Sequence, residues 1–291
     1  MPAGREVRHL VDDGALSLVG DEYGEKLPAV VLLHGLAGYA GEWKGSASWL
    51  ADDHRVVALD QRGHGRSSRL PGDASRSAYV ADVISVIENL DVGPVILIGQ
   101  SLGGHTAMLA AAQRPDLVTA LVVAEASPGR DSEGPSRVRR WLSAWPVPFG
   151  SRASAFDFFH TMKYFHSSLA AQVWADGLEE RPDGWWPRFD TEVIIGSLAE
   201  VATRDYWDRW EAIRCPTLIV RGEHGALPRE AVERMLALLP AAQFAQIDGA
   251  GHDLHLDRPE PWRTVVTDFL APGALTSTPT ATPVPGPSPS M

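Results

Sequence analysis

Residues 95–104 read VILIGQSLGG, and this stretch decides how the rest of the chain is interpreted. An apolar run, Val95–Ile98, leads directly to Ser101, which has a glycine two positions before it and another two positions after it. This G-x-S-x-G pattern is typical of a sharp turn between a strand and a helix that exposes the serine Oγ. The glycines are expected because a side chain at either position would collide with the neighbouring strand and helix. The stretch therefore predicts a nucleophile at Ser101.

The chain around this turn predicts an α/β fold with a doubly wound, mostly parallel sheet. Parallel strands covered on both faces appear as short apolar runs, and the helical patterns between them fit crossover helices. An earlier segment, Ala15–Gly20, is expected to add a leading antiparallel strand. The predicted buried strands are Ala29–Leu33, Val56–Leu59, Val95–Ile98, Leu121–Ala124, Leu218–Val220 and Phe244–Ile247, and the predicted helices are Ala78–Leu90, Leu102–Arg114, Arg229–Leu239 and Pro261–Leu270.

The alternation stops between about Gly129 and Glu211, where helix-like patches, prolines and seven of the ten tryptophans replace the buried strands. We expect a helical cap here, inserted after the sixth strand and lying over the edge of the sheet where ligands bind in open α/β folds. The last residues are rich in Pro, Ser and Thr, which predicts a disordered tail. The predicted organisation is core at 1–128, cap at 129–211, core again at 212–271 and tail at 272–291.

Composition argues against several classes of partner. The formal net charge is −11 at pH 7, and the only basic group is the short run at Arg137, Arg139 and Arg140, so neither nucleic acid nor an anionic membrane is expected. The single cysteine, Cys215, excludes an internal disulfide and a cysteine metal cluster. The N-terminus lacks the apolar segment of a signal peptide, so we expect a cytoplasmic protein. No cofactor or metal is predicted, the expected partner is a small-molecule substrate, and a homodimer is left open.

The motifs resemble those of the α/β-hydrolase fold superfamily over roughly Ala15 to Leu270. The combination of four motifs in the family's order is far more specific than any one of them. The resemblance implies an oxyanion hole formed by the backbone N–H groups of Leu36 and Leu102. The motifs are VVLLHGLAG at 30–38, ALDQRGHGRSS at 58–68, GQSLGG at 99–104 and DGAGHDLHLDRPE at 248–260.

The expected catalytic base is His252. A serine hydroxyl needs an imidazole to take its proton and to return it later to the leaving group. His252 follows the predicted strand at Phe244–Ile247, and its place after the serine matches the family order of Ser, acid and His. His255 is the closest competitor, but we expect it in the following turn and helix. His64 and His105 have equally good structural interpretations, as a loop hydrogen bonder and as a helix residue packed beside the site.

The catalytic acid is the point at which the sequence departs from the family pattern. Many relatives carry an aspartate after the strand that here reads TLIVRG, but Gly225 stands at that position. Some branches take the acid from the end of the preceding strand of the sheet, where this chain has Glu125. A carboxylate there would reach the same imidazole nitrogen. We therefore assign Glu125 as the acid and keep Glu223 as the alternative. Asp248 and Asp253 are disfavoured because sequence neighbours of a histidine rarely point at its ring.

The predicted function is that of a cofactor-independent serine hydrolase acting on a small to medium, largely apolar ester or lactone. An acyl-enzyme on Ser101 would be hydrolysed by water that His252 activates. Trp43, Trp185 and Trp186 are candidate substrate contacts, although burial in the fold is the default for each. A serine at the elbow argues against haloalkane dehalogenases and epoxide hydrolases. Three alternatives stay open: a cofactor-free ring-cleaving dioxygenase, a carbon–carbon bond hydrolase and, least expected, a non-catalytic ligand-binding protein.

Overall fold

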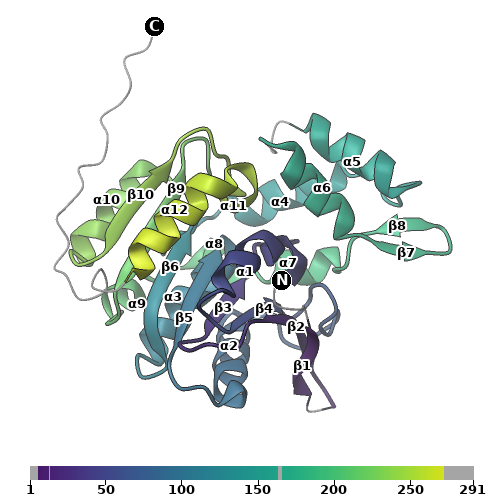
Figure 1. The fold of residues 1–291 in the computed structure, drawn as a ribbon. Coiled ribbons are helices and arrows are strands. Elements are labelled where there is room, and N and C mark those ends of the chain that lie inside the picture. The colour runs from purple at the N-terminus through teal and green to yellow at the C-terminus, as the bar shows by residue number, and fades with distance from the viewer. Residues whose placement is uncertain (1–5, 13, 163–165, 272–291) are drawn as a thin grey trace, which may run out of the picture.

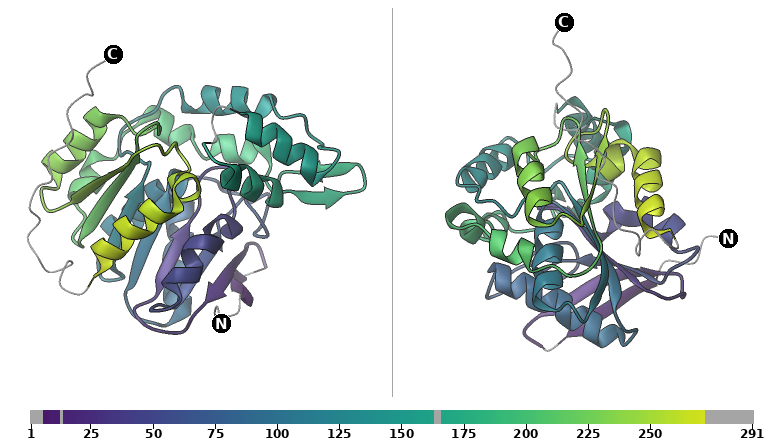
Figure 2. Two further views of the ribbon diagram at one scale, coloured as in Figure 1. Left: turned by 45° about the horizontal axis from the view of Figure 1, so that its top comes forward. Right: turned by 90° about the vertical axis from the view of Figure 1, so that its left-hand side faces the viewer.

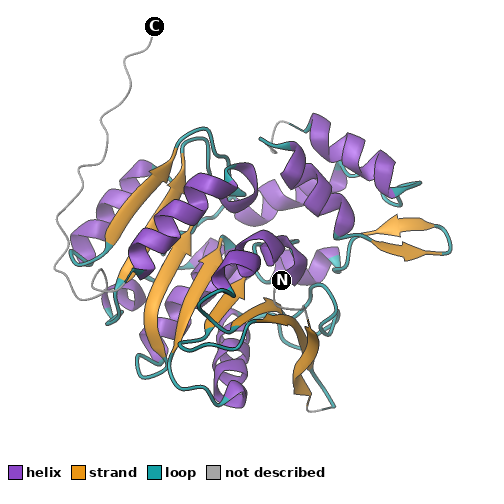
Figure 3. Cartoon of the chain, viewed as in Figure 1, coloured by secondary structure: helices purple, strands orange, loops and turns teal. Residues whose placement is uncertain are grey.

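The computed structural model describes residues 6–12, 14–162 and 166–271, so the predicted tail lies outside the described residues. Eight strands form one sheet in the order β1-β2-β4-β3-β5-β6-β9-β10 (Figures 1 and 3). The first two strands pair antiparallel, and β2 also pairs antiparallel with β4, whereas the remaining neighbours are parallel. The strands are β1 (Glu6–Asp12), β2 (Ser17–Tyr23), β3 (Val30–Leu33), β4 (Val56–Asp60), β5 (Val95–Gln100), β6 (Val118–Ala124), β9 (Thr217–Gly222) and β10 (Gln243–Ile247).

The predicted doubly wound sheet is thus confirmed, and the structure adds β1, whose mostly exposed residues give no apolar run to recognise. Alternate residues of each central strand enter two separate hydrophobic cores, as the period of two in a strand requires. In β3, Val31 and Leu33 face one core while Val30 and Leu32 face the other. Figure 2 shows helices on both sides of the sheet.

The helices divide between these two faces. The first core is covered by α2 (Arg76–Leu90), α3 (Leu102–Gln113) and α10 (Arg229–Leu238). The second is covered by α1 (Lys44–Leu50) and α12 (Pro259–Leu270). Both layers hold the C-terminal ends of β5, β6 and β9 side by side, which is where a site can be assembled from distant parts of the chain. Two short helices, η1 (Ala40–Trp43) and α11 (Leu254–Asp257), follow loops at that edge.

The segment between β6 and β9, called the cap here, holds most of a third apolar cluster, which mixes aliphatic and aromatic side chains and also includes Ala37 and Leu256 from outside the segment. It contains a two-stranded hairpin as well as helices, and the hairpin was not expected from the sequence (Figure 1). Its last helix packs on the core instead: Trp210 is fully buried and its indole donates to the Met235 carbonyl at 2.8 Å. The elements are α4 (Gly134–Ser143), α5 (Arg152–Thr161), α6 (Ser168–Asp176), β7 (Glu179–Arg181), β8 (Gly184–Trp186), α7 (Thr191–Gly196), α8 (Ala199–Thr203) and α9 (Trp207–Glu211).

Among the helices described, none combines the length and the apolar character needed to cross a membrane.

Candidate active site

Ser101 stands at a strained turn between β5 and α3. Its backbone angles, φ of 52° and ψ of −115°, lie outside the regions that residues other than glycine ordinarily adopt. Its backbone N–H donates to the Ala124 carbonyl at 2.8 Å. A Cβ added to Gly99 would lie 2.3 Å from the Gly103 carbonyl oxygen, and one on Gly103 would lie 2.1 Å from the Leu33 carbonyl oxygen. The two glycines therefore let strand and helix approach closely enough to hold this turn.

Glu125 and His252 are brought together across the edge of the sheet. Glu125 directly follows β6 with a φ of 53°, and its Oε2 lies 3.1 Å from His252 Nδ1. The Glu125 side chain is fully buried, whereas 16% of the His252 side chain is exposed. A carboxylate on Nδ1 fixes that nitrogen as the proton donor and directs the opposite nitrogen, Nε2, to act as an acceptor. This is the geometry that a serine base requires.

Backbone donors hold the Glu125 carboxylate in place. Its Oε1 accepts the Gly222 N–H at 2.8 Å, and its Oε2 accepts the Ala226 N–H at 2.5 Å and the Leu227 N–H at 3.1 Å. A Cβ added to Gly225 would lie only 2.2–2.4 Å from the carboxylate atoms. Glu125 thus occupies the space that a side chain at residue 225 would need.

The two other acidic candidates that follow β9 and β10 point elsewhere. Glu223 Oε2 accepts the backbone N–H of Gly249 at 2.8 Å, and its side chain is 43% exposed. Asp248 Oδ1 accepts from the Gln246 amide at 3.0 Å. Neither contact involves the His252 ring.

The charge around His252 raises the pKa of its imidazole above 6.5. Burial is the largest single influence and lowers the pKa, but it is outweighed by the Glu125 hydrogen bond, the Glu125 charge and the charge of Asp253 together. Asp253 is itself buried, which raises its pKa to about 6, and it accepts the Trp174 indole N–H at 2.8 Å. The imidazolium that forms when a serine is deprotonated is therefore stabilised by its surroundings.

Two buried histidines shape the loop that carries Leu36. His34 Nε2 accepts the Gln61 backbone N–H at 3.0 Å, so its Nδ1 carries the proton and donates to the Gly35 carbonyl at 2.8 Å. His64 Nε2 likewise accepts the Ala37 N–H at 3.3 Å. Burial lowers the pKa of His34 to about 4 and that of His64 to about 3, so both rings stay neutral and keep these bonds.

The loop lies directly against the serine turn. A Cβ built on Gly35 would be 3.4 Å from Ser101 Cβ, and Leu102 opens α3, where the first N–H groups have no partner within the helix. These positions suit the two backbone donors that the resemblance implied.

Gln100 is a site residue that the sequence reasoning missed. Its side-chain amide donates to the backbone carbonyl of His252 at 2.9 Å. A Cβ on Gly35 would lie 2.2 Å from the Gln100 Oε1, so the same side chain also packs on the loop that carries Leu36, called the oxyanion loop below. The Gln100 side chain therefore links the serine turn to the His252 loop and to the oxyanion loop. The G-x-S-x-G pattern allows any residue at this position, so the pattern gives no signal for it.

The competing histidines are packed within the fold. His255 is buried in α11, where its ring stacks on Trp43 with centroids 4.2 Å apart and lies 3.8 Å from Glu42. Burial lowers the pKa of His255 to about 3. His105 packs edge-on against Tyr206, with centroids 4.9 Å apart. Neither ring contacts Glu125 in the described residues.

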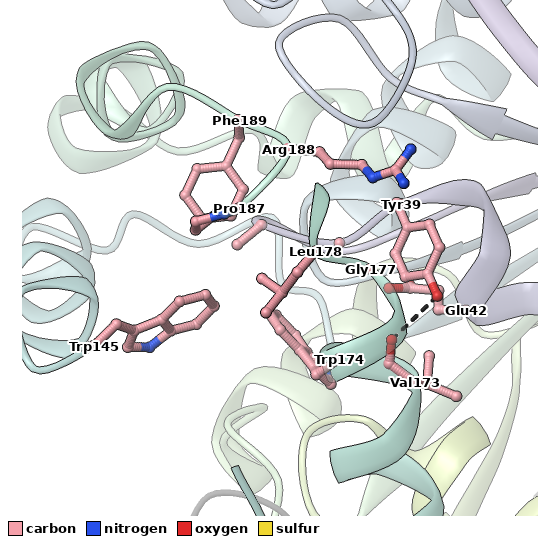
Figure 4. A pocket seen from close by; sticks show the side chains of 12 residues that line it. Tyr39, Glu42, Trp145, Val173, Trp174, Gly177, Leu178, Pro187, Arg188 and Phe189 are labelled. Carbon is pink, nitrogen blue, oxygen red and sulfur yellow. Dashed lines mark hydrogen bonds between the residues drawn. The ribbon is translucent and has the colours of Figure 1, made fainter. Parts of the chain in front are cut away.

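A narrow cavity of about 20 Å³ separates the oxyanion loop from the cap (Figure 4). None of the three predicted substrate contacts lines it. Trp43 is fully buried in the second core, and Trp185 and Trp186 lie on the hairpin strand β8, where Arg152 and Arg181 stack on their rings. The cavity is lined by Ala37, Gly38, Tyr39, Glu42, Trp145, Val173, Trp174, Gly177, Leu178, Pro187, Arg188 and Phe189.

Comparison with known proteins gives consistent results. A family model described as the alpha/beta hydrolase family matches residues 30–264. The chain is 30% identical over 255 residues to a mouse sn-1-specific diacylglycerol lipase, ABHD11, covering 84% of this chain and 81% of that protein. It is 28% identical to a 2-hydroxy-6-oxononadienedioate/2-hydroxy-6-oxononatrienedioate hydrolase of Paraburkholderia xenovorans, covering 91% and 94%. A crystal structure of E-2-(acetamidomethylene)succinate hydrolase matches with a TM-score of 0.84 at 26% identity, covering 92% and 99%.

Proposed function

The chain belongs to the alpha/beta hydrolase family, and we propose that it is a cofactor-independent serine hydrolase with Ser101 as its nucleophile. One observation carries the proposal: a buried carboxylate, Glu125, lies on Nδ1 of the histidine whose loop is bonded to the serine turn. This arrangement supplies the nucleophile, base and orienting acid that acyl transfer needs.

In the proposed mechanism, His252 Nε2 takes the Ser101 proton as Oγ attacks the substrate carbonyl. Glu125 accepts a hydrogen bond from the Nδ1–H and offsets the positive charge of the imidazolium. The developing oxyanion accepts from the backbone N–H groups of Leu36 and Leu102. His252 then gives its proton to the leaving alcohol, and a water activated by the same ring hydrolyses the acyl-enzyme.

We propose that the substrate is a small to medium carboxylic ester or lactone. The aromatic and aliphatic walls of the cavity beside Leu36 favour a substrate with apolar parts, because such walls bind by removing apolar surface from water. The mouse relative is named a lipase, which agrees with ester cleavage.

The test is to label the protein with a fluorophosphonate probe and to assay it with p-nitrophenyl esters and aromatic lactones. Labelling of Ser101 and turnover without oxygen are expected, and Ser101→Ala should abolish both while remaining folded. Oxygen consumption by an active Ser101→Ala variant would instead indicate the dioxygenase alternative.

The acid is tested separately by comparing three carboxylate variants. Glu125→Gln should lower kcat by roughly ten-thousand-fold, the cost of losing the orienting acid in a comparable triad. Glu223→Gln and Asp248→Asn should stay near the wild-type rate, because those carboxylates bond to Gly249 and Gln246. A Glu125→Gln enzyme as active as either control would remove Glu125 from the mechanism.

A further inference from the structure

Arg188 is a cation in the wall of the cavity. Its Nε is buried without a hydrogen-bond partner, and within the described parts of the chain no carboxylate lies within ion-pair distance of its guanidinium. Figure 4 shows the guanidinium near the Tyr39 ring, on the side of the cavity away from Trp145. A half-buried guanidinium without a partner has lost water contacts and gained nothing in return.

Two other arginines of the cap are paired with carboxylates. Arg139 pairs with Glu192 through two hydrogen bonds of 2.6 and 2.8 Å, although both side chains are largely exposed. Arg181 donates to Glu179 at 2.5–2.7 Å. Arg188 is more enclosed than Arg139 and still lacks such a partner, so it is better placed to bind an anion from outside the chain.

The backbone holds Arg188 close to the proposed reaction centre. The next residue, Phe189, forms an isolated β-bridge with His64, and the His64 ring accepts the N–H of Ala37. Ala37 follows Leu36 directly and lines the same cavity as Arg188. Arg188 and the loop that carries Leu36 therefore line one cavity.

The charge of the cavity wall also favours an anion. Glu42 also lines the cavity, but burial raises its pKa well above the usual range, which favours the uncharged acid. The positive charge of Arg188 is therefore not balanced from within the wall.

We propose that Arg188 binds a carboxylate of the substrate, so that the enzyme prefers esters that carry a second, free carboxylate. This inference rests on the proposed hydrolase function and narrows its substrate class. Arginine suits the role because its planar fork can bond both carboxylate oxygens. A carboxylate bound to Arg188 would lie in the cavity that Ala37 also lines.

The experiment compares esters that differ only in the free carboxylate. Mono-p-nitrophenyl glutarate is paired with p-nitrophenyl valerate, and p-carboxyphenyl butyrate with phenyl butyrate, so the carboxylate is tested on each side of the ester. The wild type should prefer the charged member of at least one pair in kcat/KM. Arg188→Gln should reduce that preference by about 30-fold or more, mainly through KM, because a desolvated charge pair is lost.

The control variant is Arg139→Gln, which removes a cap arginine that lies outside the cavity and should leave the preference unchanged. Added salt should weaken the wild-type preference more than that of Arg188→Gln. A wild type that prefers neither charged ester, or an Arg188→Gln enzyme with the same preference as the wild type, would overturn the carboxylate site. Failure of the hydrolase function is distinguishable, since neither Ser101 labelling nor turnover of the neutral esters would then occur.

Discussion

At the scale of single residues, the Glu125 carboxylate occupies the space that a side chain at residue 225 would need. The Glu125 carboxylate fills the volume beside Gly225 and receives three backbone N–H groups there as well as the His252 ring. A glycine after β9 is what makes that position possible. The glycine at position 225, where the family pattern has an aspartate, and the glutamate that follows β6 therefore depend on each other. Exchanging the residues at positions 125 and 225 tests this dependence.

Gly225→Ala should reduce kcat by at least about a hundredfold, because the new Cβ would displace the carboxylate that orients His252. Glu125→Gly should be similarly impaired, since it leaves the ring without an acid. The double variant Glu125→Gly with Gly225→Asp should recover part of the lost kcat, and the backbone at residue 125 tolerates glycine because its φ is 53°. Rates of p-nitrophenyl ester hydrolysis decide the outcome, and an active Gly225→Ala enzyme would contradict the steric argument.

The pKa of His252 predicts how activity depends on pH. The base must be neutral to accept a proton, and the surroundings of His252 raise its pKa above the ordinary value of 6.5. The value of kcat/KM should therefore be highest at high pH and fall as pH decreases through this raised pKa. Asp253→Asn should move the midpoint to lower pH, because the Asp253 charge helps to raise the pKa. Glu223→Gln is the control and should leave the midpoint in place. A wild-type midpoint at or below 6.5 would contradict this account of the site.

At the scale of elements, the serine turn depends on how closely α3 approaches β3. Gly103→Ala would place a Cβ 2.1 Å from the Leu33 carbonyl oxygen, which cannot move without shifting a central strand. We expect a loss of about 1–3 kcal/mol in the free energy of unfolding and a large loss of activity. Gly45→Ala in α1 is the control, because no atom lies within 4 Å of its added Cβ and alanine favours helix. Thermal unfolding and ester hydrolysis of both variants provide the comparison.

At the scale of the whole molecule, the cap is bonded to the loop that carries His252. The Trp174 indole of α6 donates to Asp253 at 2.8 Å, next to the proposed base. Trp174→Phe should cost about 1–3 kcal/mol in the free energy of unfolding, because a buried carboxylate loses a donor. Trp186→Phe is the matched control, since that indole bonds to Asp183 within the exposed hairpin. Equal unfolding temperatures for the two variants would show that the Trp174 bond does not stabilise the junction.

The sequence by itself determined the sheet and the serine turn, and the resemblance of its motifs to those of α/β hydrolases pointed to Glu125 as the partner of His252. The sheet and the turn depend on local rules: apolar runs form buried strands, and a glycine pattern marks a tight turn. The parts that the sequence did not determine are side-chain contacts between segments far apart in the chain.

Only the tertiary structure decided what surrounds those residues. Gln100 reaches the His252 loop, His64 holds Ala37, and the Arg188 Nε is buried with no hydrogen-bond partner among the described residues. Trp43 fills a core and Trp185 and Trp186 stack under arginines, and their predicted contact with substrate stays a prediction. A tryptophan looks the same in sequence whether it lines a cavity, fills a core or stacks under an arginine. Burial and pairing are properties of the assembled fold, and no local pattern encodes them.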